Sequence, residues 1–512
     1  MKETRPVLIV GAGPTGLTAA MELARFGVPV RLVDQYAAPA DTSRAIAVQS
    51  RTVELMQQRG LAEPMLALGN KGYAATLYEG ATQLGKVDLH HIDSRFNFVL
   101  LLSQAETERI LREQLERLGV RVERDTQLVA CAQLEGAASG VRATLRKTNG
   151  GVEEVEAAYL IDAEGAHSTV RHGMHLAFEG NSLPNTYMLA DLYLDGAVPE
   201  DELSIFIPES GLLAAFPMGN RRFRLIATEK HELAHDAPEP GLAEIQAAWE
   251  QGVPIPVHLR DLQWSARFRI NSRALTRLRH GNIFFAGDAA HIHSPAGGQG
   301  MNTGIQDAIN LGWKLAMVHR GLASDALLDT YGEERLPIIA RLLSTTERAT
   351  DLANSDSHFV HTLLRHLLPR VLSFEAVRRK GAGIVSELDA NYRPSSLNGK
   401  TEGGGAVHAG DRFPDVALAR EGGARALDIL DPSRLTLVAL GAADLTAPRR
   451  LARYRDFCVE RPVPAPSAAL AAALGAATVA VVRPDGYLLC AGEPAFVAAQ
   501  LDDWFDRWSR AA

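Results

Sequence analysis

The feature that most constrains the fold is a strand, a glycine-rich turn, a helix and a second strand within RPVLIVGAGPTGLTAAMELARFGVPVRLVDQY, residues 5–36. Residues 7–10 form a short apolar run typical of a buried parallel strand, and residues 11–16 spell GxGxxG. Apolar residues return at helical spacing from Leu17 to Ala24, and a second apolar run, 28–33, ends at Asp34. This order predicts the βαβ unit of an α/β nucleotide-binding fold.

Each part of this unit has a physical role in holding a dinucleotide. Gly11 allows the tight turn, Gly13 lets the backbone approach a pyrophosphate, and Gly16 permits close packing of helix on strand. The helix N-terminus attracts the anion, and the acid that ends the second strand accepts from a ribose hydroxyl. The predicted contacts are Gly11, Gly13, Pro14, Thr15, Gly16, Asp34 and Gln35. The motif alone leaves FAD and NAD(P) both open, and we find no second unit of this length.

A second glycine-rich motif follows a strand near the middle of the chain, in FFAGDAAHIHSPAGGQGMN, residues 284–302. Residues 283–286 predict a buried strand, and Asp288 lies just past its carboxyl end, where open α/β sheets bind ligands. A carboxylate there can accept hydrogen bonds from a polyol chain. The following glycines bring backbone N–H groups close to a planar ligand, and a helix begins at about Asn302. Its positive N-terminal end favours negative charge on a reduced flavin ring.

With these motifs the chain resembles the group A flavoprotein aromatic hydroxylases, the FAD-dependent, single-component monooxygenases related to para-hydroxybenzoate hydroxylase and phenol hydroxylase. The branch it resembles has a C-terminal thioredoxin-like domain and includes polyketide and pentachlorophenol hydroxylases. The segments that carry the resemblance are GAGPTG with Asp34, YLIDAEGAHSTVR at 159–171 and GDAAHIHSPAGGQGMNTGIQDAINLGWKLA at 287–316. Smaller matches are TSRAIAVQSRTVELM at 42–56, LLSQAETERIL at 101–111, LLDTYGEERLP at 327–337 and RPDGYLLCAG at 483–492.

The resemblance implies an α/β fold: a GR2-type Rossmann-like FAD-binding domain, an inserted, mainly antiparallel β-sheet substrate domain, and a C-terminal thioredoxin-like domain. We expect the FAD-binding domain at 1–175 and 271–395, the substrate domain at 176–270, a glycine-rich linker at 396–410 and the last domain at 411–512. Short strand-like segments divided by Pro and Gly support the middle assignment. The last domain lacks CxxC, so we expect a structural or subunit-interface role for it.

The resemblance also implies further site residues. Arg44 and Gln104 match positions that contact FAD, and Asp288 would meet the ribityl chain or the pyrophosphate. The residues expected against the flavin ring are Pro295, Gly298, Gly300, Met301 and Asn302. Candidates for the substrate pocket are Phe206, Phe216, Pro217, Met218, Phe223, Trp264 and Phe268, although aromatic residues in a sheet are more often ordinary core. No catalytic residue is assigned; His91, His291 and His293 are the candidate bases.

One departure from the family pattern concerns the second motif. Glu164-Gly165 stands where the family has Asp-Gly, and Asp162 replaces a small residue two positions earlier. The family Asp is linked to both FAD and NAD(P)H contacts, so the longer Glu changes the reach of that carboxylate. Arg171, which ends the motif, is expected on the cofactor side or in a structural role.

Composition excludes several other classes of protein. The 53 Lys and Arg against 61 Asp and Glu give a formal net charge of −8, and no long basic run could follow a nucleic-acid backbone. The three cysteines form no CxxC pair, which fits a reducing cytoplasm. No signal peptide, membrane span or metal site is expected, and we interpret His358, His361 and His366 as surface or core residues. A homo-oligomer stays an open alternative.

The implied activity is NAD(P)H-consuming hydroxylation of a phenolic or polycyclic aromatic substrate through a flavin hydroperoxide, with FAD bound and NADPH or NADH as transient co-substrate. The alternatives are an FAD-dependent oxygenase of another outcome, Baeyer–Villiger-type or decarboxylative, and a non-catalytic flavin-binding partner. Halogenation is disfavoured because the WxWxIP motif is absent from the sequence.

Overall fold

The computed structural model describes residues 5–40, 45–134, 139–208, 211–229, 238–294, 298–353, 370, 374–419 and 423–509. Five residues named above lie outside the described residues: Arg44, Pro295, His358, His361 and His366.

A six-stranded sheet carries the first domain. Its order is β18 (Arg279–His280), β19 (Ile283–Phe285), β12 (Tyr159–Asp162), β1 (Val7–Val10), β2 (Val30–Val33) and β8 (Val122–Glu123). All neighbours are parallel except the antiparallel edge strand β18. Val10 pairs with Asp162, which pairs with Phe285, so the turns that follow β1, β12 and β19 meet at one edge of the sheet.

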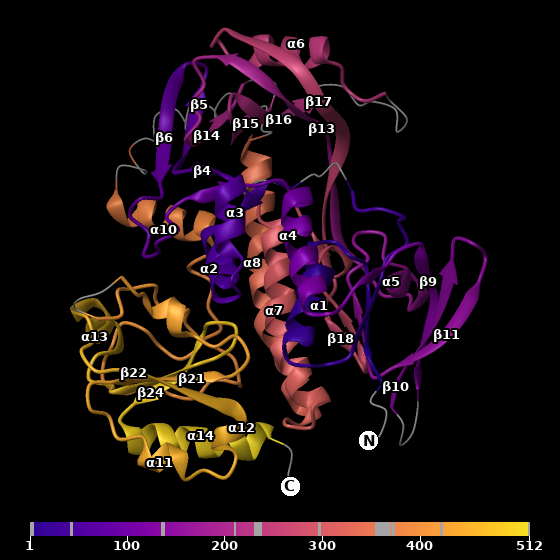
Figure 1. The fold of residues 1–512 in the computed structure, drawn as a ribbon. Helices are drawn as coiled ribbons and strands as arrows, with labels where there is room; N and C mark the ends of the chain where they lie inside the picture. The colour runs from indigo at the N-terminus through magenta and orange to yellow at the C-terminus, as the bar shows by residue number, and fades with distance from the viewer. Residues whose placement is uncertain are drawn as a thin grey trace.

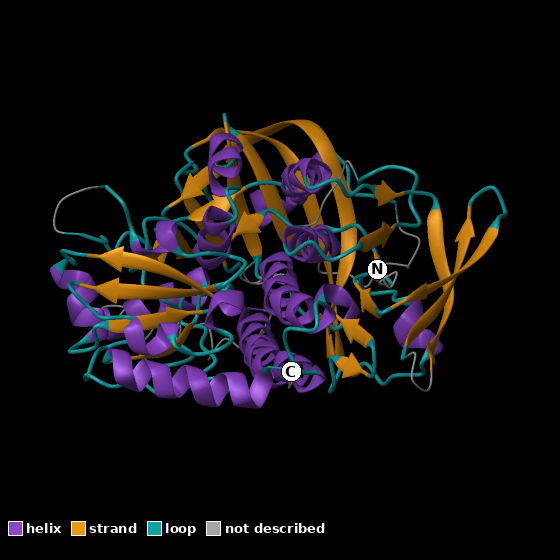
Figure 2. Ribbon diagram, turned by 60° about the horizontal axis from the view of Figure 1, so that its bottom comes forward, coloured by secondary structure: helices purple, strands orange, loops and turns teal. Residues whose placement is uncertain are grey.

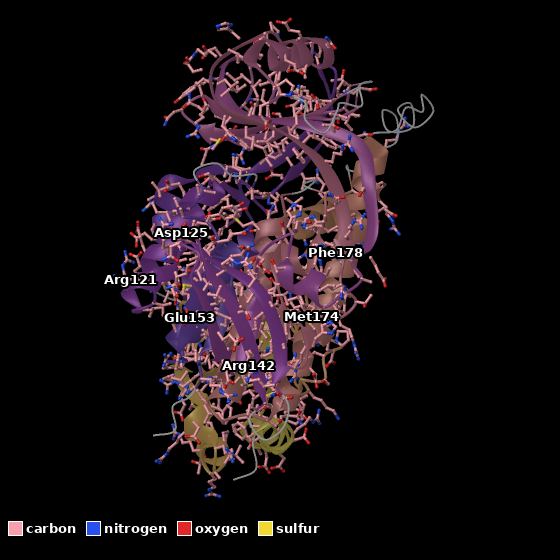
Figure 3. The ribbon with its side chains drawn as sticks, turned by 90° about the vertical axis from the view of Figure 1, so that its right-hand side faces the viewer. Arg121, Asp125, Arg142, Glu153, Met174 and Phe178 are labelled. Atoms are coloured by element: carbon pink, nitrogen blue, oxygen red, sulfur yellow. The ribbon has the colours of Figure 1, made fainter. Side chains whose placement is uncertain are left out.

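Helices α1 (Pro14–Arg25), α4 (Gln104–Arg117) and α7 (Gly300–His319) pack beside this sheet, and α7 runs through the centre of the molecule (Figure 1). Residues 301–317 of α7 are all buried. The helix packs closely on α1, because a Cβ added at Gly312 would lie 2.6 Å from Glu22 Cβ. The antiparallel sheet of β9 (Thr126–Leu134), β10 (Gly140–Lys147) and β11 (Val152–Ala157) lies on the opposite flank; Figure 3 labels Arg142 and Glu153 on it.

An eight-stranded, mostly antiparallel sheet forms the second layer. Its order is β20 (His291–Ile292), β17 (Val257–Ala274), β13 (Glu179–Gly196), β16 (Arg222–Glu229), β15 (Leu213–Gly219), β14 (Glu202–Phe206), β5 (Ala74–Glu79) and β6 (Thr82–Asp88). Helix α6 (Leu242–Gly252) covers its outer face. The sheet therefore takes β5, β6 and β20 from outside the range 176–270 that the sequence suggested.

Smaller elements join the two layers. Strands β3 (Ala47–Val48), β7 (Val99–Leu101) and β4 (Asn70–Gly72) form a short sheet near α2 (Ser50–Gln58) and α3 (Ala62–Leu68). Helices α8 (Asp329–Ala353) and α10 (Glu375–Ser386) complete this part. Across the described residues, every helix is too short or too polar to span a bilayer.

The C-terminal domain has the expected thioredoxin-like topology. Parallel strands β21 (Leu435–Leu440) and β22 (Cys458–Val463) are followed by the antiparallel hairpin β23 (Val479–Val482) and β24 (Leu488–Gly492), with α14 (Pro494–Trp508) at one side (Figure 2). The expected linker is not a free spacer, because Glu402 N donates to Ala491 O at 2.9 Å and Gly410 N donates to Leu488 O at 2.8 Å. It packs along the last sheet.

We predict that Arg59→Met lowers the free energy of unfolding by about 3–5 kcal/mol, because it leaves the buried Glu22 carboxylate without its ion pair. Both Glu22 oxygens accept from Arg59 at 2.7 Å, and both side chains are fully buried. Arg109→Met is the control, since that side chain is 38% exposed and pairs only with its own helix; its effect should be below about 1 kcal/mol. Urea unfolding of both variants measures the difference, and equal losses would contradict the prediction.

Candidate active site

The glycine-rich turn leaves space for a ligand at one position only. Gly11 has φ +97°, and a Cβ there would lie 2.2 Å from Ala163 O. A Cβ at Gly16 would lie 1.8 Å from Gly11 O, whereas a Cβ at Gly13 would meet nothing within 4 Å. Two glycines thus serve chain packing and the third faces open space at the N-terminus of α1. No side chain caps that helix end. This is the geometry that a pyrophosphate requires.

Asp34 connects the end of β2 to this turn. Its Oδ2 accepts from Ala12 N at 2.7 Å, its Oδ1 accepts from Tyr36 N at 2.9 Å, and Arg124 lies 3.5 Å away. Each carboxylate oxygen has a second lone pair, so a ribose hydroxyl can still donate to it. Gln35 is exposed beside it. Pro14 begins α1. The Thr15 hydroxyl lies between the turn after β19 and α7, because a Cβ at Gly287 or Gly304 would lie 2.4 or 2.3 Å from its oxygen.

The turn after β19 is held between α1 and α7. Gly287 has φ +59°, and a Cβ there would lie 2.4 Å from Thr15 Oγ1 of α1. Its N–H donates to Asp307 Oδ2 of α7 at 3.1 Å. Asp288, the next residue, is exposed although its neighbours on both sides are buried. The turn therefore places Asp288 at the edge of the six-stranded sheet where the glycine-rich turn also lies.

The start of α7 is held by Asn302, which is fully buried. Its Nδ2 donates to Ala47 O and Gly298 O at 2.9 Å, and its Oδ1 accepts from Gln49 N at 2.9 Å. The side chain thus joins α7 to β3. A planar ligand at this helix end would meet backbone groups near Gly298 and Gly300. Gln104, at the start of α4, donates to Glu108 at 2.8 Å.

Asp162 and Glu164 serve the turn after β12. Asp162 is fully buried, accepts from Ser168 Oγ, and accepts from Glu164 N at 3.0 Å. Burial and the nearby Glu164 charge raise the pKa of Asp162 to about 7. Glu164 accepts from Thr169 N and Val170 N at 2.9 and 3.2 Å, so it caps helix α5 (Thr169–Gly173). The departure from the Asp-Gly pattern thus places this carboxylate on a helix end. Arg171 donates to Ala289 O at 2.9 Å and lies over Phe178, which Figure 3 labels.

The candidate pocket residues divide between the two faces of the large sheet. Phe206 and Phe223 pack with Trp249 of α6 on the outer face, and Pro217 pairs with Phe223 there. On the inner face, Phe216, Trp264 and Phe268 form one apolar cluster with Tyr187. Side chains alternate along a strand, so neighbours such as Phe216 and Pro217 point to opposite faces.

The inner face reaches the expected flavin end of α7. Phe216 and Met218 also contact the apolar cluster of Ile46 and Ala47, and Ala47 O accepts from Asn302. Arg224, 1% exposed, lies on this face, donates to Asp191 at 2.6 and 2.8 Å and lies 5.6 Å over the Trp264 ring. An aromatic surface with one buried guanidinium therefore lies beside the start of α7.

The three candidate histidine bases occupy different environments. His91 is exposed in a loop. His291 Nε2 lies 2.7 Å from Asp307 Oδ2, and both side chains are buried. His293 donates from Nδ1 to Ser294 O at 2.7 Å, and burial lowers its pKa to about 4, so it is neutral at physiological pH. Within the described chain, no three His, Cys, Asp or Glu side chains gather as metal ligands would.

Sequence reasoning missed two buried carboxylates, Asp307 within α7 and Glu387 next to it. Asp307 accepts from Arg335 Nε of α8 at 2.6 Å, besides its contacts with Gly287 and His291. Glu387, at the end of α10, accepts from Gln306 and lines a hollow with Gln299, Thr303 and Arg341. A second hollow, of about 690 Å³, lies between β6, α10 and Arg412. No predicted pocket residue lines either one. One signal in the sequence could have indicated Asp307: acidic and amide side chains interrupt the apolar pattern of α7.

We predict that Glu387→Gln stabilises the protein at pH 8 but not at pH 4.5. Burial raises the pKa of Glu387 to about 8 from 4.5 in the unfolded chain. The native state therefore keeps a proton that the unfolded state releases, and stability is lost as pH rises from 4.5 to 8. Gln cannot ionise, so its advantage in the free energy of unfolding should grow to about 4 kcal/mol across this window. Urea unfolding at both pH values tests this, with the exposed Glu402→Gln as control; a pH-independent difference would contradict it.

The chain is similar to known flavin-dependent enzymes over most of its length. Residues 4–346 match the family model described as "FAD binding domain". The chain is 39% identical to 6-methylpretetramide 4-monooxygenase of Streptomyces rimosus, over 95% of this chain and 90% of the relative. It is 33% identical to pentachlorophenol 4-monooxygenase of Sphingobium chlorophenolicum, over 86% and 80%.

A solved structure shows the same fold at similar identity. The anhydrotetracycline hydroxylase OxyS from Streptomyces rimosus superposes with a TM-score of 0.80 and 31% identity, over 98% of this chain and 99% of that one. The glycine-rich turn, the buried α7 and the thioredoxin-like domain thus occur in one architecture shared over nearly the full length. The chain belongs to the FAD-binding aromatic hydroxylase family and is a flavin-dependent aromatic monooxygenase.

Proposed function

We propose that this monooxygenase hydroxylates a phenolic or polycyclic aromatic substrate, with NAD(P)H and dioxygen as co-substrates. The observation that carries the proposal is the inner face of the large sheet, where Phe216, clustered with Trp264 and Phe268, also packs in the cluster of Ala47, whose carbonyl accepts from Asn302 of α7. Aromatic surfaces that carry a few polar groups line many small-molecule sites. One relative is named for 6-methylpretetramide and the other for pentachlorophenol, and these names support an aromatic substrate.

The proposed cofactor contacts follow from the sheet edge. Gly13 faces the pyrophosphate, Asp34 and Gln35 the adenosine ribose, and Asp288 the ribityl chain. Arg44, Gln104 and Pro295 keep the roles that the family resemblance implies. Gly298, Gly300 and Met301 present backbone to the flavin ring, whose reduced form activates dioxygen when FAD is bound.

The described residues also suggest how the protein assists this chemistry. Residues 301–317 of α7 are buried, which keeps water from the reacting region beside this helix. The N-terminus of α7 favours negative charge on the nearby ring. Arg224, held by Asp191, is a fixed cation on the aromatic face and would favour an ionised phenol.

We predict that Gly13→Ala weakens FAD binding at least about 10-fold without destabilising the apoprotein. A Cβ there meets nothing in the chain, and the backbone φ of −75° suits alanine, but the methyl group would occupy the space where the pyrophosphate approaches. Gly173→Ala is the control, because a Cβ there also meets nothing within 4 Å. Flavin fluorescence titration measures the FAD dissociation constant, and unchanged affinity in Gly13→Ala would remove this glycine from the FAD site.

We predict that one class of phenol or polycyclic aromatic accelerates reduction of the bound flavin. Holoprotein is mixed anaerobically with NADPH or NADH, with and without each compound, and the loss of flavin absorbance is followed. In air, the effective compound should gain one oxygen as a ring hydroxyl while one NAD(P)H is oxidised. A product with oxygen inserted in the ring, or with carbon dioxide lost, would favour the oxygenases of other outcome. Flavin that neither nicotinamide reduces would favour a non-catalytic flavin-binding partner.

A further inference from the structure

The RPDGY turn of the C-terminal domain, residues 483–487, inserts into the FAD-binding domain. Arg483, with a fully buried side chain, donates to Glu334 Oε1 and Oε2 of α8 at 2.6 and 2.8 Å. Asp485 Oδ2 accepts from Trp313 Nε1 of α7 at 3.2 Å, and its backbone oxygen accepts from Arg51 of α2 at 2.8 Å. One hairpin turn therefore contacts three helices of the other domain.

The ion pairs around this turn are balanced in charge. Arg483 and Lys314 face Glu334 and Asp485, and Lys314 Nζ lies 2.7 Å from Glu334 Oε2. Burial alone would raise the pKa of Glu334, but the Arg483 and Lys314 charges hold it well below its usual range. Because all four groups are buried, removal of one leaves an uncompensated charge.

A second set of contacts leads from this turn to Asp307 of α7. The rings of Tyr487 and Tyr392 lie with centroids 4.2 Å apart. The Tyr392 hydroxyl accepts from Arg335 Nη1 at 3.0 Å, and Arg335 Nε donates to Asp307 Oδ1 at 2.6 Å. Glu334 and Arg335 are consecutive in α8, so the same helical turn forms the ion pair with Arg483 and the hydrogen bond to the Tyr392 hydroxyl.

Asp307 is the last link. Its Oδ2 accepts from Gly287 N at 3.1 Å and lies 2.7 Å from His291 Nε2. These two contacts bracket the turn 287–291, which carries Asp288. Thr15 of α1 fills the space on the other side of Gly287. The position of Asp288 is therefore set by α1 on one side and by Asp307 on the other.

We propose that the C-terminal domain positions the FAD-binding turn through this buried chain, Tyr487–Tyr392–Arg335–Asp307, with Arg483 and Glu334 fixing α8. Arg335, Asp307, Tyr392 and Tyr487 are positioning residues that act on Asp288 through the backbone of residues 287–291. The inference rests on the proposed role of Asp288 in holding FAD. It gives the RPDGY segment a function in cofactor binding that needs no thiol chemistry.

Tyr487→Leu is the informative variant: it removes the ring that contacts Tyr392 and lies under the Arg51 and Arg483 guanidinium groups, and it leaves both arginines paired with their carboxylates. We expect it to raise the FAD dissociation constant roughly 2- to 30-fold at a temperature where the protein is folded. Tyr487→Phe keeps the ring and should bind FAD like the parent. Arg449→Met, which breaks an exposed ion pair with Glu460 in the same domain, is the matched control. Arg483→Met should weaken FAD binding too, but Tyr487→Leu decides the outcome if that variant does not fold.

A double-mutant cycle separates positioning from general destabilisation. Asp307→Asn breaks the last link, so adding Tyr487→Leu to it should change the FAD dissociation constant by less than about 2-fold. Urea unfolding of the apoproteins reports stability separately. The inference is overturned if Tyr487→Leu lowers stability but binds FAD like the parent, or if the two changes multiply. These readouts need neither substrate nor NAD(P)H, so failure of the proposed hydroxylation would leave their result unaffected.

Discussion

The structure depends on the burial of α7 with its polar side chains paired. A helix whose residues 301–317 are all buried would be expected to be apolar on every side, yet this one carries Asn302, Gln306, Asp307 and Lys314. Each finds its partner on another element: β3, α10, the turn after β19, or α8. Because an unpaired buried polar group costs more free energy than a pair contributes, these contacts specify how the elements assemble.

This pairing also bears on the sheet edge proposed to hold the cofactor, which is built from distant parts of the chain. The glycine-rich turn, the turn after β12 and the turn after β19 are brought together by the parallel register of β1, β12 and β19. Their exact positions then depend on side chains behind them: Thr15 and Asp307 around Gly287, and Asp162 and Glu164 around helix α5. The turns proposed to meet the cofactor are thus held in place by side chains packed behind them.

The two faces of the large sheet show that a sequence pattern can predict strands without predicting which face each side chain joins. The aromatic residues of β14, β15, β16 and β17 lie in the predicted middle sheet, but the sequence pattern does not say which face each one joins. The outer face buries Phe206 and Phe223 under Trp249, and the inner face keeps Trp264 beside Arg224. Both faces are covered, one by α6 and one by the FAD-binding domain, so both are apolar and alternation alone cannot distinguish them.

By itself, the sequence determined the local geometry and the family. Each local motif requires something of only a few consecutive residues: a positive φ, a missing Cβ or a carboxylate at a strand end. These motifs are GAGPTG, Asp34 and the run around Asp288. Only the tertiary structure decided the partners and the protonation of the individual carboxyl groups. Glu164 caps α5, Asp307 holds the turn after β19, Glu387 keeps its proton, and the RPDGY turn inserts between α7 and α8. Those outcomes depend on partners that lie up to several hundred residues away, and on burial that exists only after the chain has folded.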